Sequence, residues 1–153
     1  MINHRIRGLA ALHNLSLLAV TFAWFWVVHY LWEINGRELI NLPWNYALVA
    51  AVGVLVASFG SFQEYGAFLM KRGWRRFAGS VMKANFQGGL LAFFVFAAYF
   101  ATKDKETSRL FLATFIGSSW PVLAVANYVL PGVVRRVIQP RVQGRKSVII
   151  GDG

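Results

Sequence analysis

Residues 8–32 read GLAALHNLSLLAVTFAWFWVVHYLW, a run of 25 residues without Asp, Glu, Lys or Arg. A helix of about 20 mainly apolar residues crosses the hydrocarbon layer of a bilayer, so this run is long enough to span it. Three further uncharged, apolar runs follow at 39–63, 84–102 and 110–134. Four such runs in 153 residues leave no polar shell to cover them in water. The sequence therefore predicts an all-α membrane protein with four transmembrane helices, at about 9–32, 43–62, 84–102 and 110–134.

The composition excludes several classes of protein. The chain is 57% apolar with 6 Trp, 5 Tyr and 13 Phe, which is unlike a disordered chain or an ordinary soluble enzyme. It has no Cys, so a disulfide scaffold, a zinc–thiolate site, an iron–sulfur cluster and a thiol nucleophile are excluded. No span contains a charged residue, which disfavours a pump or secondary transporter. The sequence assigns no catalytic residue and no metal ligand, and Asp104 and Glu106 are interpreted as solvated in a loop.

The net charge of +10 is confined to one side of the predicted membrane. The termini and the second loop together hold 12 basic and 2 acidic residues, whereas the first and third loops hold 4 of each. The positive-inside rule makes the basic side cytoplasmic, so both termini are predicted to face the cytoplasm. Charge that flanks spans meets anionic lipid headgroups, so we expect membrane lipids as partners and no nucleic acid.

The second loop, residues 63–83, alternates aromatic and basic side chains. This pattern predicts an interfacial amphipathic segment between helices two and three, although a loop that only sets topology is an equally good interpretation. A second basic cluster follows the fourth span. The residues that we expect to bind lipid headgroups or lipid phosphate are Lys71, Arg72, Arg75, Arg76, Arg135 and Arg136.

Two histidines lie on the first helix, 16 residues apart, so His13 and His29 cannot share one metal ion. Each could separately ligate a haem or a chlorin, but a histidine paired with water or a neighbour is the commoner case. We therefore assign no cofactor to this chain.

Four polar amides fall within the spans, and they allow two interpretations. They could form hydrogen bonds between helices, which we favour, or they could line a polar path. The four are Asn14, Asn85, Gln87 and Asn127.

The last eight residues, 146–153, read KSVIIGDG, a basic start followed by a strand-like run and Gly-x-Gly. A Rossmann-like domain begins in this way, although the third glycine and the following helix do not appear. We therefore divide the chain into a four-helix transmembrane domain at 1–140 and, at 141–153, a linker and the first strand of a truncated Rossmann-like domain.

The order of these pieces resembles the N-terminal membrane region of the bacterial polyprenyl glycosylphosphotransferases. The similar elements are FGSF at 59–62 on leaving span two, TSRLFL at 107–112 on entering span four, VVRRVI at 133–138 on leaving it, and the final Gly-x-Gly. The resemblance implies a multi-pass anchor and assembly module in the bacterial inner membrane, for an enzyme that initiates exopolysaccharide synthesis. That enzyme transfers a sugar-1-phosphate to undecaprenyl phosphate.

The resemblance also limits what the chain can do. The Mg²⁺ and the catalytic residues of the family belong to a further domain with no counterpart in these residues, so the chain as given is not expected to be catalytic. A homo-oligomer or other membrane subunits are expected as partners. The alternative is a non-catalytic accessory subunit of a photosynthetic or respiratory membrane complex, packing against partner helices or pigments.

Overall fold

The computed structural model describes residues 2–37, 44–59, 70–105 and 107–149, and all the regular elements among them are helices. They are α1 (Ile2–Ile34), α2 (Trp44–Phe59), α4 (Trp74–Thr102) and α5 (Arg109–Ile149). Three segments, His4–Ile34, Trp74–Thr102 and Arg109–Arg136, are long and apolar enough to cross a membrane, and α2 is a shorter apolar helix. An all-helical membrane protein is therefore the class that the structure supports.

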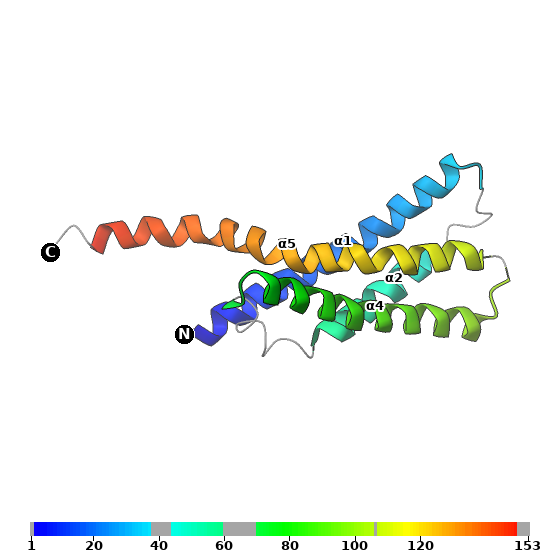
Figure 1. Cartoon of the computed structure of the whole chain (residues 1–153), viewed down its shortest axis with the longest axis horizontal. Helices are drawn as coiled ribbons and strands as arrows, with labels where there is room; N and C mark the ends of the chain where they lie inside the picture. The colour runs from blue at the N-terminus through cyan, green and yellow to red at the C-terminus, as the bar shows by residue number, and fades with distance from the viewer. Residues whose placement is uncertain (1, 38–43, 60–69, 106, 150–153) are drawn as a thin grey trace.

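Successive helices run in opposite directions, and each packs against two neighbours (Figure 1). The contacts run from α1 to α2, from α2 to α4, from α4 to α5 and from α5 back to α1. The start of α1, the start of α4 and the C-terminal half of α5 lie at one end of the bundle, which we call the basic end. The other end, where α1 and α4 finish, is the opposite end.

The core is aromatic towards the opposite end. Phe25, Phe111 and Phe115 are fully buried, and the ring of Phe25 meets the other two edge-on at centroid distances of 5.6 and 5.1 Å. Large apolar side chains are also exposed on every helix, from Leu12 on α1 to Val133 on α5. A surface of this kind suits lipid rather than water as the surrounding solvent.

Small residues bring α2 and α4 close together. A Cβ added at Gly53 would lie 3.0 Å from the Cα of Leu91 and 3.1 Å from the carbonyl oxygen of Leu90. Ala47, Ala50 and Ala57 on the same helix are buried as well. The small residues of α2 therefore serve packing within the bundle, as small residues at helix interfaces in membranes commonly do.

The ends of the helices follow local sequence signals. Gly36, at φ 71°, ends α1, with hydrogen bonds from its N–H to the carbonyl of Glu33 and from the N–H of Arg37 to the carbonyl of Trp32. This is a Schellman arrangement, which needs a left-handed residue that glycine supplies. The hydroxyl of Ser108 accepts a hydrogen bond from the N–H of Phe111 at 3.3 Å and so caps the start of α5.

Two segments differ from the prediction. Trp74–Lys83 forms the first turns of α4, continuous with the predicted span, rather than a separate interfacial helix; residues 63–69 lie outside the described residues. Residues 141–149, predicted as a linker and strand, continue α5 as a helix. A single strand has no partner for its backbone groups, whereas a helix satisfies them locally. Residues 150–153 lie outside the described part, and the Rossmann-like domain stays a prediction.

Candidate functional site

The six predicted phosphate-binding residues lie at the basic end, four of them on helices and two just before α4. Lys71 and Arg72 precede α4, Arg75 and Arg76 lie in its first turn, and Arg135 and Arg136 lie on α5. Five of the six side chains are exposed, and Arg76 is half-buried. The positive end of the α4 dipole adds to this basic charge, so the surface favours an anion.

Arg76 differs from the other five residues because it holds two helices together. Its Nη2 donates a hydrogen bond to the carbonyl oxygen of Tyr128 on α5 at 2.9 Å, and its guanidinium lies 5.2 Å from the centre of the Tyr128 ring. A Cβ added at Gly132 would lie 3.8 Å from the same nitrogen. Arg136 lies one helical turn beyond Gly132, on the same side of α5. The two predicted clusters therefore belong to neighbouring parts of one surface.

A buried chain of hydrogen bonds joins one side chain from each of the four helices. His13 Nε2 lies 3.2 Å from Asn127 Oδ1, Asn127 Nδ2 donates to Gln87 Oε1 at 2.7 Å, and Gln87 Nε2 donates to Ser58 Oγ at 3.2 Å. These four residues, which we call the polar chain, are all buried. Asn127 Nδ2 also donates to the carbonyl of Leu123 at 2.8 Å.

The polar chain confirms hydrogen bonding between helices for Gln87 and Asn127. Asn85 also bonds across a helix pair, since it accepts a hydrogen bond from Trp120 Nε1 at 3.0 Å. Buried amides in a membrane need such partners because the hydrocarbon offers none. Ser58 was not predicted as a member. It lies four residues after Val54, on the buried face of α2, and that helical spacing is the signal that could have found it.

The two histidines occupy different environments. Nε2 of His13 faces Asn127, so a haem iron at this nitrogen would have to displace that contact. His29 Nε2 lies 3.7 Å from Glu33 Oε1, one turn further along α1, and its ring meets Trp26 and Phe111 edge-on. Within the described ranges, no group of three or more His, Asp or Glu residues is placed to hold a metal ion.

Asp104, interpreted from the sequence as solvated, is half-buried in the structure. Its carboxylate accepts hydrogen bonds from the hydroxyl of Tyr46 at 2.8 Å and from the backbone N–H and hydroxyl of Thr107. The prediction was wrong because Tyr46 is 58 residues away along the chain and only the fold brings it near. Glu106 lies outside the described residues.

No family model, no curated protein and no solved structure matches this chain. The resemblance to the polyprenyl glycosylphosphotransferases therefore rests on the order of sequence motifs alone. What the structure itself offers is a bundle with an apolar surface, a polar chain in its core and a basic surface at one end.

Proposed function

We propose that the chain is a four-span membrane anchor with both termini in the cytoplasm of a bacterial cell. Three of its helices have the length and composition of spans. The fourth, α2, is about 24 Å long at 1.5 Å per residue, and the uncharged run around it, 39–63, is long enough to cross. The basic end would then face the cytoplasm, as the positive-inside rule requires.

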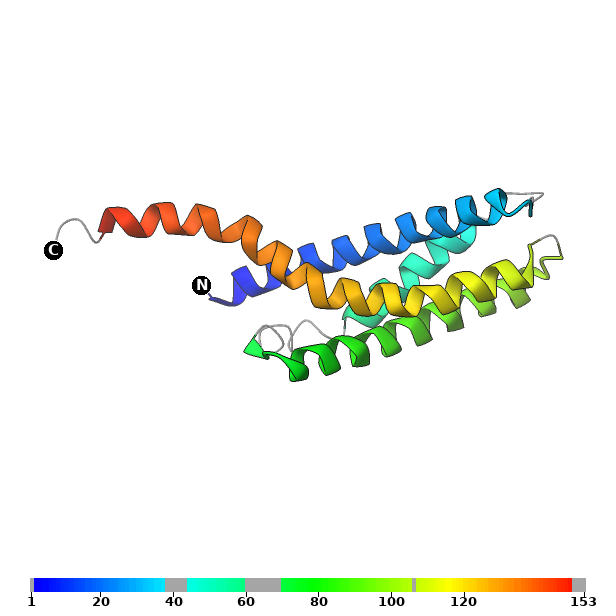
Figure 2. The ribbon, with the colours of Figure 1, turned by 45° about the horizontal axis from the view of Figure 1, so that its top comes forward.

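The observation that carries the anchor proposal is the length of α5. Its 41 residues extend over about 62 Å, roughly twice the thickness of the hydrocarbon layer. Arg135 and Arg136 end the uncharged run, and the rest of the helix projects beyond the bundle at the basic end (Figure 2). A helix that leaves the membrane in this way can carry a cytoplasmic domain at a fixed distance from the bilayer.

We infer the wider role from the sequence resemblance: the anchor and assembly module of a polyprenyl-phosphate sugar-1-phosphate transferase. In this role the exposed basic residues of α4 and α5 would meet lipid phosphate at the cytoplasmic interface. The intact mass of the protein isolated from its natural source tests this. A mass well above 17.2 kDa, corresponding to hundreds of further residues, supports a transferase with its catalytic domain. A mass near 17.2 kDa contradicts it.

Single-cysteine labelling tests the topology, because the chain contains no cysteine of its own. The exposed positions His4 and Met70 mark the basic end, and Asn35 and Lys105 mark the opposite end. We expect a membrane-impermeant maleimide to label Asn35→Cys and Lys105→Cys in intact cells. The other two variants should react only after lysis. The reverse pattern, or different behaviour of two sites at one end, contradicts four spans with cytoplasmic termini.

Arg75 and Arg76 form a matched pair that separates lipid binding from packing. Arg75 is exposed, so Arg75→Ala should weaken the preference for vesicles containing anionic lipid and leave the unfolding midpoint unchanged. Arg76→Ala removes a charged hydrogen bond between helices and should lower stability by about 1–2 kcal/mol. Vesicle partitioning and detergent unfolding measure the two effects. Equal effects of the two substitutions in both assays would contradict the distinction.

The accessory-subunit alternative is favoured by exposed aromatic side chains in the middle of helices. Phe86, Phe93 and Phe96 on α4 are all exposed. These rings could pack against partner helices or pigments as well as against lipid. Stoichiometric co-purification of other membrane subunits with a 17.2-kDa chain would support this alternative over the transferase anchor.

A further inference from the structure

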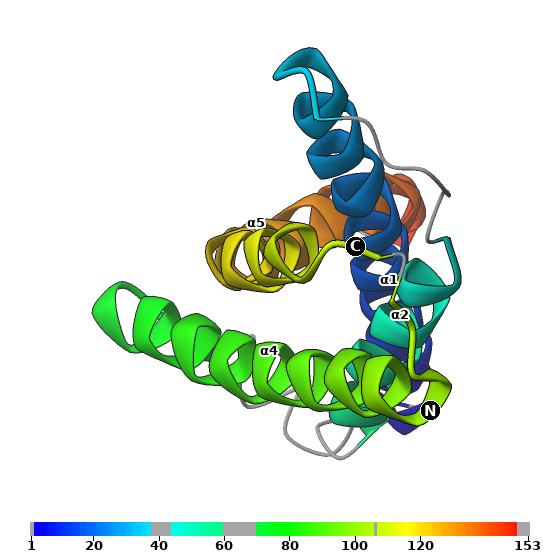
Figure 3. The ribbon, with the colours of Figure 1, turned by 90° about the vertical axis from the view of Figure 1, so that its right-hand side faces the viewer.

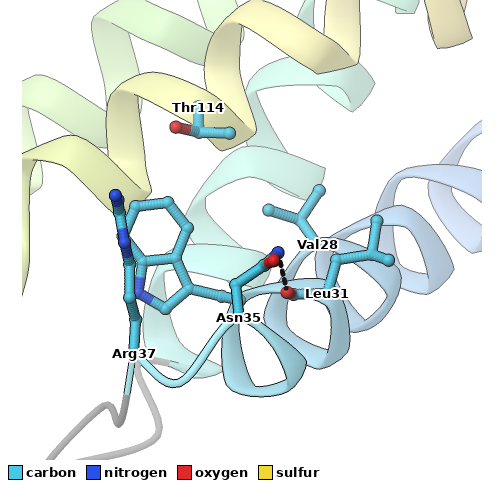
Figure 4. A pocket seen from close by; sticks show the side chains of 6 residues that line it. Val28, Leu31, Asn35, Arg37 and Thr114 are labelled. Atoms are coloured by element: carbon cyan, nitrogen blue, oxygen red, sulfur yellow. Dashed lines mark hydrogen bonds between the residues drawn. The ribbon is translucent and has the colours of Figure 1, made fainter.

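A pocket of about 470 Å³ lies at the opposite end of the bundle, away from the basic surface. Its volume falls within the range of small-ligand sites. Figure 4 shows that residues from the end of α1 and the turn after it line the pocket on one side, with one residue of α5 facing them. The lining residues are Val28, Leu31, Trp32, Asn35, Arg37 and Thr114.

The pocket exists because α1 leans away from the rest of the bundle towards its C-terminal end (Figures 1 and 3). Val28 is buried at the base, whereas Leu31 and Thr114 are exposed along the walls. The opening between α1 and α5 thus has an apolar floor. In a membrane, this opening would admit the upper part of a lipid chain.

Trp32 forms a fixed platform at the mouth of the pocket. Its ring meets the buried ring of Phe111 edge-on at a centroid distance of 5.7 Å, which ties it to α5. The turn at Gly36 brings the chain back over the end of α1, and the guanidinium of Arg37 lies 4.7 Å from the centre of the Trp32 ring. A guanidinium stacked on an aromatic face keeps its in-plane N–H groups available, and their fork matches a phosphate.

Arg37 is the cation of this pocket. No carboxylate among the described residues lies within ion-pair distance of it. The other two polar side chains of the lining are engaged locally. Asn35 Nδ2 donates to the carbonyl of Leu31, and the Thr114 hydroxyl donates to the carbonyl of Leu110, each at 2.8 Å. An anion entering the pocket therefore meets one charged donor above an apolar floor.

We propose that this pocket binds a phospholipid with net negative charge, with its phosphate on Arg37 and its first chain segments against Val28 and Leu31. The depths of the two groups in the membrane fit a lipid, because Thr114 lies about 7.5 Å inside the start of α5 whereas Arg37 follows the end of α1. The phosphate thus lies at headgroup height and the chain at the height of the spans. The inference rests on the proposed membrane placement of the bundle.

Lipid titration of the purified full chain, read by native mass spectrometry, tests the proposal. The probes are phosphatidylglycerol, phosphatidylcholine and glycerol 3-phosphate. We expect one phosphatidylglycerol per chain to bind more tightly than phosphatidylcholine, and no binding of glycerol 3-phosphate at the same concentration. Arg37→Ala should weaken phosphatidylglycerol binding roughly tenfold, as expected for the loss of a charge-assisted contact.

Two further variants control for charge and for shape. Lys105→Ala removes an exposed cation at the same end outside the pocket and should leave binding unchanged. Thr114→Trp fills the pocket without altering charge and should weaken phosphatidylglycerol binding as Arg37→Ala does. Circular dichroism in detergent confirms that each variant is folded.

The proposal would be overturned by equal losses in Arg37→Ala and Lys105→Ala, by tight binding of glycerol 3-phosphate, or by unchanged binding in Thr114→Trp. A dimer that Thr114→Trp abolishes would assign the pocket to a second copy of the chain and would overturn it as well. Failure of the proposed topology is seen separately, in the cysteine labelling pattern, because the titration in detergent reads only the pocket.

Discussion

Asn127 occupies the middle of the polar chain, so its replacement by leucine disrupts contacts to two other helices at once. Two interhelical hydrogen bonds are lost, worth about 0.6 kcal/mol each in membrane proteins. The Gln87 carbonyl oxygen stays buried without Asn127, and a buried oxygen that loses its donor costs about 1–3 kcal/mol. We therefore expect Asn127→Leu to lower the free energy of unfolding by about 2–4 kcal/mol.

A second substitution separates hydrogen bonding from packing. Removal of both partners of a buried hydrogen bond is close to neutral. The hydroxyl of Ser58 keeps its bond to the carbonyl of Val54 at 2.7 Å when Gln87 is replaced. The double variant Asn127→Leu with Gln87→Leu should thus be less destabilised than the sum of the two single variants, by about 1 kcal/mol or more.

Equilibrium unfolding in mixed dodecylmaltoside and dodecyl sulfate micelles, followed by circular dichroism, measures these differences. Asn85→Leu is the matched control. It removes one exposed hydrogen bond between α4 and α5, the two helices that the Asn127–Gln87 bond also joins. We expect it to cost no more than about 0.6 kcal/mol. A loss below about 0.5 kcal/mol for Asn127→Leu, or strict additivity in the double variant, would refute the role given to the polar chain.

Two further substitutions test the close packing of α2 against α4 and the hydrogen bond between Tyr46 and Asp104 at the opposite end. Gly53→Ala should destabilise the bundle by about 1–3 kcal/mol in the same unfolding assay, because the new Cβ meets the backbone of Leu91. Gly89→Ala is its control and should not destabilise, since nothing lies within 4 Å of its new Cβ. Tyr46→Phe should cost about 1 kcal/mol, through loss of the hydrogen bond to Asp104.

The outcomes that contradict these two predictions are distinct. Equal stability of Gly53→Ala and Gly89→Ala would mean that α2 and α4 do not approach as closely as described. For Tyr46, the control is Tyr30→Phe, which alters an exposed side chain on α1. Equal effects of these two substitutions would show that the Tyr46 hydroxyl adds nothing to stability.

The predicted spans lie within helices because charge is absent over long runs and returns at the ends of those runs. The predicted span 9–32 lies within α1, and 110–134 lies within the apolar first part of α5. The predicted span 84–102 likewise lies within α4, and the helix itself begins ten residues earlier, at Trp74. The basic residues of 74–83 ended the apolar run without ending the helix, since backbone hydrogen bonds continue through charged positions.

The sequence allowed the types of residue at the candidate site to be predicted. It did not allow most of their contacts to be predicted. The sequence places Arg76 among the basic residues of one side, but its bond to Tyr128 joins positions 52 residues apart. The polar chain likewise spans 114 residues between His13 and Asn127. Hydrophobic periodicity indicates which face of a helix is buried. It does not indicate which other helix packs against that face.

The polar chain joins the first helix to the last, and this has a consequence for biogenesis. His13 and Asn127 are 114 residues apart, so at 5–20 residues per second about 6–23 s separate their synthesis. Gln87 precedes its donor Asn127 by 40 residues, so it waits about 2–8 s before that donor is synthesised. A nascent bundle that stalls after three helices displays a polar amide where the finished one displays none. In hydrocarbon an amide without its partner is costly, so a bundle that lacks its last helix carries a penalty that the complete bundle does not.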